Sequence, residues 1–586
     1  MTTTAGAPDE RGVDWRPLDV GRAARAALLA VPLLVLLVQA WVHRWITDDG
    51  FIDLRVVQQI VAGHGPVFNA GQRVETFTSP LWVAILTIAD VVTPIRLEWL
   101  AVGLGIAATV AGLALAMAGS GAIARRVDGG GWLVPAGAIV PLAVLPFWYF
   151  ASSGLETGLV FGWQGASLWI LARWAVRGRR LAWWEAAVLG LGWLVRPELV
   201  LFSVVFLVAV LVGDRRVRGW TGRVTFAAWM FALPVAYEVF RMGYFGLVVP
   251  NTALAKEASS AWWSRGWDYL TSSFGPYWLW IPAAALVAGG YVPLVRTLRA
   301  AREERALLTV GAFVAGAVLD AAYIVRVGGD YIHARLLLPS LFALAAPVAV
   351  VVLRKRTAVT LAVVPWAFVA AIGLRSNAVP FVLPNLTRAV TTTDFGWGPH
   401  SARRAVYDAA AVTYNGRPVP VTPRAGLPLP TGASWGIGVS SYAIGPRLNV
   451  LDMLGLADVL DAHFELHRRG YPGHEKPMPP AWAVALLVEP GTPVHVRDFP
   501  QPLLVVPLEP WPRDDAELAR QVAWARAALR CPAIRDLRAR STGTLTVSRF
   551  FSNMTHSLAD SRLRIPPDPE RAYRKFCGPG FPSGTR

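Results

Sequence analysis

Two adjacent carboxylates, Asp48 and Asp49, follow the first long apolar stretch of this chain. Acidic side chains at a membrane–water boundary repel each other and lose hydration, so proteins keep such pairs mainly for catalysis or cation binding. A carboxylate in that position is suited to act as a base or a nucleophile. The alternative is that both acids end a solvated helix, where the helix dipole disfavours them. We predict that Asp48 and Asp49 are catalytic and that Asp53 lies one helical turn from Asp49.

Transfer of a group from a lipid phosphate is one reaction that suits external carboxylates, and it also needs cations that hold the leaving phosphate. The segment 328–335 offers them, because two glycines free its backbone to approach a ligand and His333 and Arg335 follow. Arginine binds phosphate through two parallel hydrogen bonds. We predict a phosphate site formed by Arg326, Asp330, His333 and Arg335. The alternative is a tight turn whose arginine reaches the interface.

Other charged residues interrupt or flank apolar stretches, which is costly unless they serve a site or pair with each other. Arg196 and Glu198 surround a proline within one stretch, Glu156 stands at the end of another, and Glu75 precedes a helix-start signal at Ser79. We predict that Glu75, Glu156, Arg196 and Glu198 line the donor site. An ion pair of Arg196 with Glu156 or Glu198 that only joins helices remains open, as does a capping role for the Ser79 loop.

The composition is that of a polytopic helical membrane protein. Of the 586 residues, 54% are hydrophobic and only 16% are charged, and the mean hydropathy is +0.42. Apolar runs long enough to cross a bilayer recur through the first two-thirds of the chain. The net charge of +17 is explained mostly by arginine clusters on cytoplasmic loops. These basic residues are scattered between runs, which argues against nucleic-acid binding.

The apolar runs predict the topology. They cover approximately 22–43, 80–93, 97–119, 132–150, 155–175, 184–195, 197–213, 222–240, 276–296, 306–326, 336–353 and 357–374. Eleven spans result if every run crosses, with 184–213 as one kinked helix. Nine result if 80–93 and the broken pair at 184–213 are re-entrant, and this count agrees better with the charge rule. The first run is predicted to be an uncleaved span that enters from the cytoplasm. Both counts place the C-terminal region outside.

From about residue 376 the pattern changes to proline-rich turns. Short strand-like stretches such as 483–489 and 502–507 alternate with amphipathic stretches such as 516–530. We predict a transmembrane domain over 1–375 and a mixed α/β soluble domain over 376–586.

The predicted soluble domain contains further candidate residues. His474 and Lys476, in a glycine- and proline-rich turn, are predicted to bind acceptor, against the alternative of a solvated loop. The two cysteines of the chain, Cys531 and Cys577, are predicted to pair if this region is extracytoplasmic, and otherwise they are free thiols.

No cofactor is demanded by the sequence. Cysteine and histidine spacings typical of zinc sites do not occur. Asp48 and Asp49 offer oxygen ligands to a hard divalent cation, but nothing in their spacing requires one.

The ordered set of motifs resembles a known family. It comprises Asp48-Asp49-Gly50-Phe51-Ile52, Thr76-Phe77-Thr78-Ser79-Pro80-Leu81-Trp82, Ser153-Gly154-Leu155-Glu156-Thr157, Arg196-Pro197-Glu198, Gly328-Gly329-Asp330-Tyr331 to Arg335, and Gly473-His474-Glu475-Lys476. Each motif is weak by itself, but their order over most of the chain resembles the membrane arabinofuranosyltransferases of mycobacterial and corynebacterial cell-wall assembly, and among these the terminal β-1,2 transferases.

This resemblance implies a GT-C fold with its active site on the outer face of the plasma membrane. It implies decaprenyl-phosphoryl-arabinofuranose as donor and the arabinan of arabinogalactan and lipoarabinomannan as acceptor. Transfer would retain configuration, because the donor and the terminal linkage are both β. The family's outer-loop aspartates are expected to be catalytic, which here means Asp48 and Asp49. The carboxylate either attacks the anomeric carbon or orients the acceptor while the leaving phosphate serves as base.

Three other functions remain open at this point. Another polyprenyl-phosphate sugar transferase, such as a mannosyltransferase, would use the same aspartates. An ion-coupled transporter would also use intramembrane charges, but no internal repeat of spans is visible. A non-catalytic scaffold would not need Asp48 and Asp49.

Overall fold

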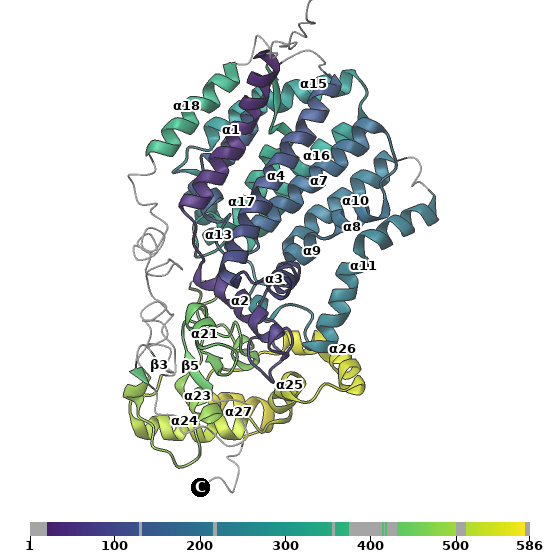
Figure 1. Ribbon diagram of the computed structural model, residues 1–586. Coiled ribbons are helices and arrows are strands. Elements are labelled where there is room, and N and C mark those ends of the chain that lie inside the picture. The colour runs from purple at the N-terminus through teal and green to yellow at the C-terminus, as the bar shows by residue number, and fades with distance from the viewer. Residues whose placement is uncertain are drawn as a thin grey trace, which may run out of the picture.

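The protein is mostly helical, with long helices at one end of the molecule and its C-terminal region at the other (Figure 1). The computed structural model describes residues 20–127, 132–214, 219–353, 358–373, 413–414, 417–418, 431–470, 472–499 and 511–579. Within these ranges α1, α4, α7 and α16 run alongside one another, and α2 lies between them and α21. The segment that begins with Asp48 is therefore placed at the junction of the two parts.

Four helices in the described ranges are long and apolar enough to cross a membrane. They are Ala24–Val42 within α1 (Val20–Val42), Leu97–Arg126 within α4 (Leu97–Val127), Trp280–Ala300, and Glu304–Val327, which is α16. Shorter apolar helices cover Pro80–Val92, Pro197–Gly213 and Arg335–Val348. These helices are those of a membrane protein, and the counts of nine or eleven spans stay predictions.

The remaining elements of the first part are mostly helices of varied length. They are α2 (Asp48–Val61), α3 (Pro80–Val92), β1 (Trp132–Val134), α5 (Ala136–Leu142), α6 (Leu145–Tyr149), α7 (Thr157–Arg177), α8 (Trp183–Gly190), α9 (Gly192–Val195), η1 (Pro197–Leu199), α10 (Val200–Gly213), α11 (Trp220–Tyr244), α12 (Asn251–Ala255), α13 (Trp263–Phe274), α14 (Trp280–Ala285), η3 (Leu286–Tyr291), α15 (Val292–Ala300), η4 (Arg335–Leu337), α17 (Leu338–Ala345), η5 (Ala346–Val348), β2 (Val351–Leu353) and α18 (Ala358–Gly373). Strands β1 and β2 pair antiparallel.

Prolines explain where these elements depart from the predicted runs. The run 132–150 was expected to be one span, but it forms β1, α5 and α6, because Pro135 and Pro146 interrupt it at the start of each short helix. The break expected within 184–213 is present, since Arg196 is extended and Pro197 begins a new helical turn. Ser79 caps α3 as expected, and its Oγ accepts a hydrogen bond from the Trp82 N–H at 3.3 Å.

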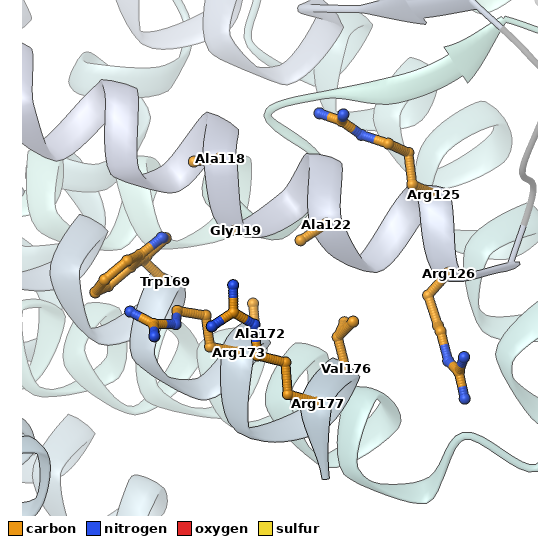
Figure 2. A pocket seen from close by; sticks show the side chains of 10 residues that line it. All are labelled: Ala118, Gly119, Ala122, Arg125, Arg126, Trp169, Ala172, Arg173, Val176 and Arg177. Carbon is orange, nitrogen blue, oxygen red and sulfur yellow. The ribbon is translucent and has the colours of Figure 1, made fainter. Parts of the chain in front are cut away.

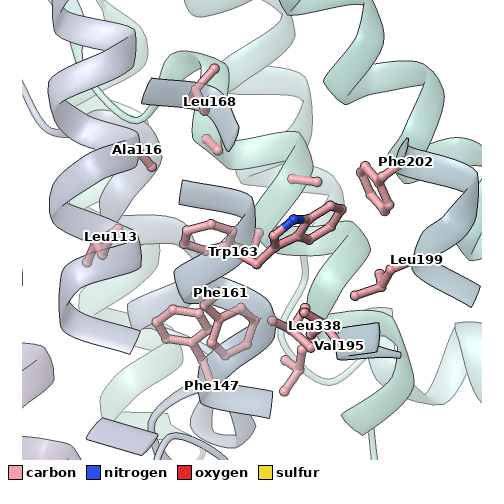
Figure 3. Close-up of a cluster of buried hydrophobic side chains, with 14 of the residues drawn as sticks. Leu113, Ala116, Phe147, Phe161, Trp163, Leu168, Val195, Leu199, Phe202 and Leu338 are labelled. Atoms are coloured by element: carbon pink, nitrogen blue, oxygen red, sulfur yellow. The ribbon is translucent and has the colours of Figure 1, made fainter. Parts of the chain in front are cut away.

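Glycines allow α4 and α7 to pack with their backbones in contact. A Cβ atom on Gly165 of α7 would lie 2.0 Å from the carbonyl oxygen of Gly112 on α4, and one on Gly158 would lie 2.3 Å from the Gly105 oxygen. Small residues at such crossings are typical of helices that associate within membranes. Next to this contact, aromatic side chains from α6, α7 and α10 form a buried cluster, including Phe147, Phe161, Trp163 and Phe202 (Figure 3).

The described part of the C-terminal region is also mainly helical. It comprises β3 (Thr413–Tyr414), β4 (Arg417–Pro418), β5 (Thr431–Ser434), α21 (Val439–Ile444), β6 (Asn449–Asp452), α22 (Val459–Ala462), α23 (Pro480–Leu487), η6 (Val496–Asp498), α24 (Asp515–Ala528), α25 (Pro532–Thr542), α26 (Val547–Arg562) and α27 (Pro569–Cys577). Strands β3 and β4 pair antiparallel, and β5 and β6 pair parallel. The described residues of this region thus form helices with short strand pairs, and the mixed α/β domain stays a prediction.

The amphipathic stretch 516–530 is helical as expected, within α24, whereas the strand-like stretch 483–489 lies largely in α23. Pro479-Pro480 begins that helix, and every residue of α23 is buried, so its apolar run reflects complete burial rather than a strand. The stretch 502–507 lies outside the described residues. Cys531 and Cys577 form a disulfide with a Cα–Cα distance of 5.5 Å.

Buried polar contacts join the two parts. The Arg55 guanidinium of α2 donates hydrogen bonds to the carbonyl oxygens of Gly445 at 3.1 Å and Leu448 at 2.7 Å. The Asn69 side chain donates to the Val450 carbonyl oxygen and accepts from the Val450 N–H, and the Asn449 side chain makes the same pair of hydrogen bonds with Ala70. The C-terminal region is therefore docked on the loops and on α2, which is the helix that carries both predicted catalytic residues.

Candidate active site

Asp48 and Asp49 occupy the first turn of a helix rather than the end of one. Thr47 is the N-cap of α2, and its hydroxyl oxygen accepts a hydrogen bond from the Gly50 N–H at 3.0 Å. The N-terminal end of a helix dipole favours negative charge, so this placement removes the objection that applied to a helix C-terminus. The backbone is fixed there because the Thr47 N–H donates to the Ser153 oxygen at 2.9 Å.

Asp49 is held by partners from the segment 328–335. The Tyr331 hydroxyl donates to one carboxylate oxygen of Asp49 at 3.2 Å, and a guanidinium nitrogen of Arg335 lies 3.4 Å from the other. Arg335 also pairs with Asp330 at 2.6 Å. Burial opposes the ionisation of Asp49, but the charges of Arg335 and Lys256 and the tyrosine hydroxyl outweigh it, so its pKa lies below the ordinary value. Asp49 is ionised at neutral pH.

Asp48 differs from its neighbour in its surroundings. Its carboxylate accepts a hydrogen bond from the Val439 N–H at 2.9 Å, and its side chain still reaches solvent. Burial against the surrounding protein and the charge of Asp49 raise the pKa of Asp48, although hydrogen bonds from the backbone N–H groups of Val439 and Gly438 oppose the effect. The backbone of Gly438 approaches so closely that a Cβ there would lie 2.0 Å from the Asp48 carbonyl oxygen. The pKa values of the two adjacent carboxyl groups are thus shifted in opposite directions. This difference suits one group to act as a base and the other to stay ionised and stabilise charge.

Two cationic or basic side chains complete the surroundings of Asp49. Lys256 lies just after α12, and its positive charge helps to lower the pKa of Asp49. Its ammonium group has no hydrogen-bond or ion-pair partner among the described residues. His474 lies edge-on to the Tyr331 ring at a centroid distance of 5.3 Å, and burial lowers its pKa. Gly473 permits this arrangement, since its φ is +86° and a Cβ on it would lie 3.2 Å from Cε of Lys256.

Three of the predicted donor-site residues, Arg196, Glu156 and Glu198, are joined by ion pairs. The Arg196 guanidinium pairs with Glu198 at 2.5 Å and also with Glu156, and all three side chains are largely buried. The ion pair that the sequence left open is therefore present. Glu156 is also an electrostatic neighbour of the buried Asp53, and together with burial and Asp49 it raises the pKa of Asp53 well above its usual range. This network extends inward from Asp49 and Arg335.

His333 is close in sequence to Arg335 but lies in apolar surroundings. It is 4% exposed and stacks on Tyr277 at a centroid distance of 5.8 Å. Neither ring nitrogen has a hydrogen-bond partner among the described residues. Burial lowers the pKa of His333 to about 4, so the ring is neutral at pH 7 and offers one N–H donor rather than a positive charge.

Three predicted residues are engaged elsewhere. Glu75 accepts hydrogen bonds from Tyr237 at 2.6 Å and Arg241 at 2.7 Å. Arg326 donates to the carbonyl oxygen of Ser259 at 3.0 Å. Lys476 is fully buried, pairs with Glu257 at 2.5 Å, and donates to backbone oxygens. The contacts of all three hold the outer loops and the C-terminal region together.

The side chains around Asp48 and Asp49 are poorly suited to bind a divalent cation. Nowhere in the described parts of the chain do three or more His, Cys, Asp or Glu side chains form a group that could hold a metal ion. One oxygen of Asp49 faces Arg335 and the other accepts from Tyr331, so both are already occupied. We therefore assign no step of the reaction to a metal at Asp48 and Asp49.

Sequence reasoning missed Lys256 and understated Tyr331. Tyr331 lies in the segment 328–335, but the sequence predicted no binding or catalytic role for its side chain. Lys256 is one of the few lysines in the chain, and that rarity was the available signal. Its relation to Asp49 depends on how residues 251–256 fold back, which has no sequence signature.

Comparison with known proteins gives two close relatives. The chain is 32% identical over 631 aligned residues to the terminal beta-(1->2)-arabinofuranosyltransferase of Mycobacterium tuberculosis, a match that covers 93% of this chain and 96% of that protein. It is 38% identical over 341 residues to the protein of the same name from Corynebacterium glutamicum, which covers 53% of this chain and 48% of that protein. No family profile matches the chain, and no solved structure matches it.

Proposed function

Because this chain belongs to the family of the terminal β-(1→2)-arabinofuranosyltransferases, we propose that it transfers arabinofuranose from decaprenyl-phosphoryl-arabinofuranose to arabinan. The enzyme class, a glycosyltransferase that delivers arabinofuranose to arabinan, follows from the family. The donor carrier and retention of configuration are our proposals. They rest on the external carboxylates and on the cations beside them, since a prenyl phosphate leaving group needs both.

The observation that carries the proposal is the surroundings of Asp49. An ionised carboxylate lies between Tyr331 and Arg335, and the ammonium group of Lys256, which has no partner among the described residues, adds a positive charge near it. Asp49 would stabilise positive charge on the anomeric carbon while its bond to the phosphate oxygen breaks. Lys256 and Arg335 would hold the phosphate that leaves with the bonding electrons.

Asp48 is suited to a different step. Its side chain is open to solvent and its pKa is raised, which is favourable for accepting a proton at neutral pH. We assign it the proton of the acceptor hydroxyl as that oxygen bonds to the anomeric carbon from the face that the phosphate leaves, which retains the configuration. Arg196 with Glu156 and Glu198 supports this site from within. His474 provides a neutral hydrogen-bonding surface for sugar hydroxyls, whereas both ring nitrogens of His333 are buried.

We also propose that the site faces the periplasm of a bacterial plasma membrane. Arg125, Arg126 and Arg177 lie at the ends of α4 and α7 that are distant from Asp48, and basic residues mark the cytoplasmic side. The Cys531–Cys577 disulfide suits an oxidising compartment for the C-terminal region. In this arrangement residues 1–375 form the catalytic part, and residues 376–586 contact the acceptor glycan.

The test is the identity of the consumed donor. Purified protein is incubated with an arabinan acceptor and with radiolabelled decaprenyl phosphates that carry either arabinofuranose or mannose. Transfer of arabinose with formation of β-linked termini supports the proposal. Transfer of mannose alone would assign the protein to another lipid-phosphate sugar transferase.

A further inference from the structure

A basic cavity lies between α4 and α7 at the end of these helices that is distant from Asp48. Its volume is about 610 Å³ (Figure 2). Helix α7 begins beside the carboxylate site, since Glu156 is its N-cap, and it ends 21 residues later at Arg177. At 1.5 Å per residue the cavity lining on α7, from Trp169 to Arg177, lies roughly 20–30 Å along the helix from Glu156, so its far end is separated from the carboxylate site by about the apolar thickness of a bilayer.

Small residues create the space and arginines surround it. The lining residues are Ala118, Gly119, Ala122, Arg125, Arg126, Trp169, Ala172, Arg173, Val176 and Arg177. Gly119 lies where the helices are still close, because a Cβ on it would be 3.2 Å from the Leu168 side chain and carbonyl oxygen. Beyond it, four arginines come from the two helices, with Arg125 and Arg126 on α4 and Arg173 and Arg177 on α7 (Figure 2).

The described residues leave the positive charge of this cavity mostly uncompensated. Arg126 pairs with Glu303 at 2.9 Å. None of the other three arginines forms an ion pair with a carboxylate in the described parts of the chain. Arg173 lies over the Trp169 ring at 4.3 Å, and its Nε is buried without a hydrogen-bond partner there. The site therefore holds several guanidinium groups whose donors are available to an anion.

The position of the cavity indicates the source of that anion. Helix α4 is one of the four helices that are long and apolar enough to span a membrane, and Arg125 and Arg126 form its last turn. Headgroups of lipids lie at that depth, and basic pockets between spanning helices bind phosphate headgroups. A phosphate diester attached to acyl chains would place its charge among the arginines and its chains along the apolar helix surfaces.

We propose that the cavity formed by Arg125, Arg173 and Arg177 between α4 and α7 binds the phosphate headgroup of an anionic lipid, separately from the sugar-donor site. The lipid would fill the space left by the small residues and neutralise the arginines. It would thereby join the ends of the two helices that lie farthest from α2, the helix that carries Asp48 and Asp49.

The experiment measures lipid binding through thermal stability. Full-length protein is purified in a nonionic detergent, and its Tm is followed by tryptophan fluorescence during separate titrations with phosphatidylglycerol, phosphatidylcholine and sodium phosphate. A ligand that binds the native state raises Tm in a concentration-dependent way. We expect phosphatidylglycerol to raise Tm and phosphatidylcholine to have no comparable effect.

The variant Arg125→Gln/Arg173→Gln/Arg177→Gln should need about tenfold or more phosphatidylglycerol for the same shift. The matched control is Arg299→Gln, which removes an exposed arginine of α15 outside the cavity and should respond like the wild type. If the triple variant is poorly folded, the single variant Arg177→Gln, at an exposed position, should show a smaller loss in the same direction.

A wild-type response to phosphatidylglycerol in the triple or the single variant would overturn the proposal. An equal shift with sodium phosphate would overturn the lipid as the source and assign the site to a soluble phosphate. The donor assay is independent of this result, because a failure of the lipid site leaves transfer from the prenyl donor in detergent unaffected.

Discussion

A guanidinium nitrogen of Arg335 lies 3.4 Å from a carboxylate oxygen of Asp49, although 286 residues separate the two in the chain. Arg335 is 7% exposed, so this contact is made in surroundings that water screens poorly. It joins the beginning of α2 to the segment that follows α16, which are distant in sequence.

Replacement of Asp49 or Asp48 by Asn should abolish arabinose transfer while the protein still folds. We expect losses in kcat of about 10²–10⁴-fold, the range for removal of a positioned acid or base. The control is Asp536→Asn, a surface carboxylate that pairs only with exposed Arg535. Turnover close to that of the wild type in both variants would contradict the catalytic assignment.

Replacement of Arg335 by Ala should reduce stability as well as activity. Removal of one partner of a buried ion pair leaves Asp330 and Asp49 uncompensated, at a cost of about 3–5 kcal/mol. Arg535→Ala, which breaks an exposed pair, should change the free energy of unfolding by about 1 kcal/mol or less. Tm measurements on both variants, in one detergent, decide the comparison.

The pH profile of Lys256→Ala should differ from that of the wild type. The pKa of Asp49 is held below its ordinary value partly by Lys256, so activity is present above that pKa and is lost as pH falls through it. Without the lysine the pKa of Asp49 rises, and the acid limb of kcat/KM moves to higher pH. KM for the prenyl-phosphate donor should rise about tenfold, and Lys575→Ala is the control. An unchanged acid limb would remove Lys256 from the site.

Packing between α4 and α7 should tolerate no side chain at Gly165. A Cβ there would meet the Gly112 backbone at 2.0 Å, so Gly165→Ala should lower stability by about 1–3 kcal/mol. Gly103→Ala is a matched control on α4, because nothing lies within 4 Å of the added Cβ. The two Tm values are compared, and equal values would show that the helices separate easily.

Loss of the disulfide should destabilise the C-terminal region. Cys531 and Cys577 are 46 residues apart, and a bridge across such a loop contributes about 2–4 kcal/mol. Cys577→Ser should therefore lower the Tm, and a reductant should lower the Tm of the wild type but not that of the variant. Equal responses to the reductant would indicate that the bridge is not what stabilises this region.

The sequence by itself determined the features that depend on local chemistry and composition. Low charge and long apolar runs identified a membrane protein, because a bilayer accepts few ionised groups. The adjacent acids Asp48 and Asp49, the cap at Ser79 and the break at Arg196-Pro197 were visible because each depends on residue type and near neighbours. The order of short motifs pointed to the family that the two relatives share.

Only the tertiary structure decided which charged residues meet. Lys476 and Lys256 both lie outside the long apolar runs, yet one is buried against Glu257 and the other faces Asp49 without a partner among the described residues. Charge pairing acts through space, over a few ångströms, and the chain distance between partners carries no information about it. Burial also depends on contacts between residues that are distant in the chain. The apolar run of α23 forms a helix because the surrounding C-terminal residues bury all of its faces.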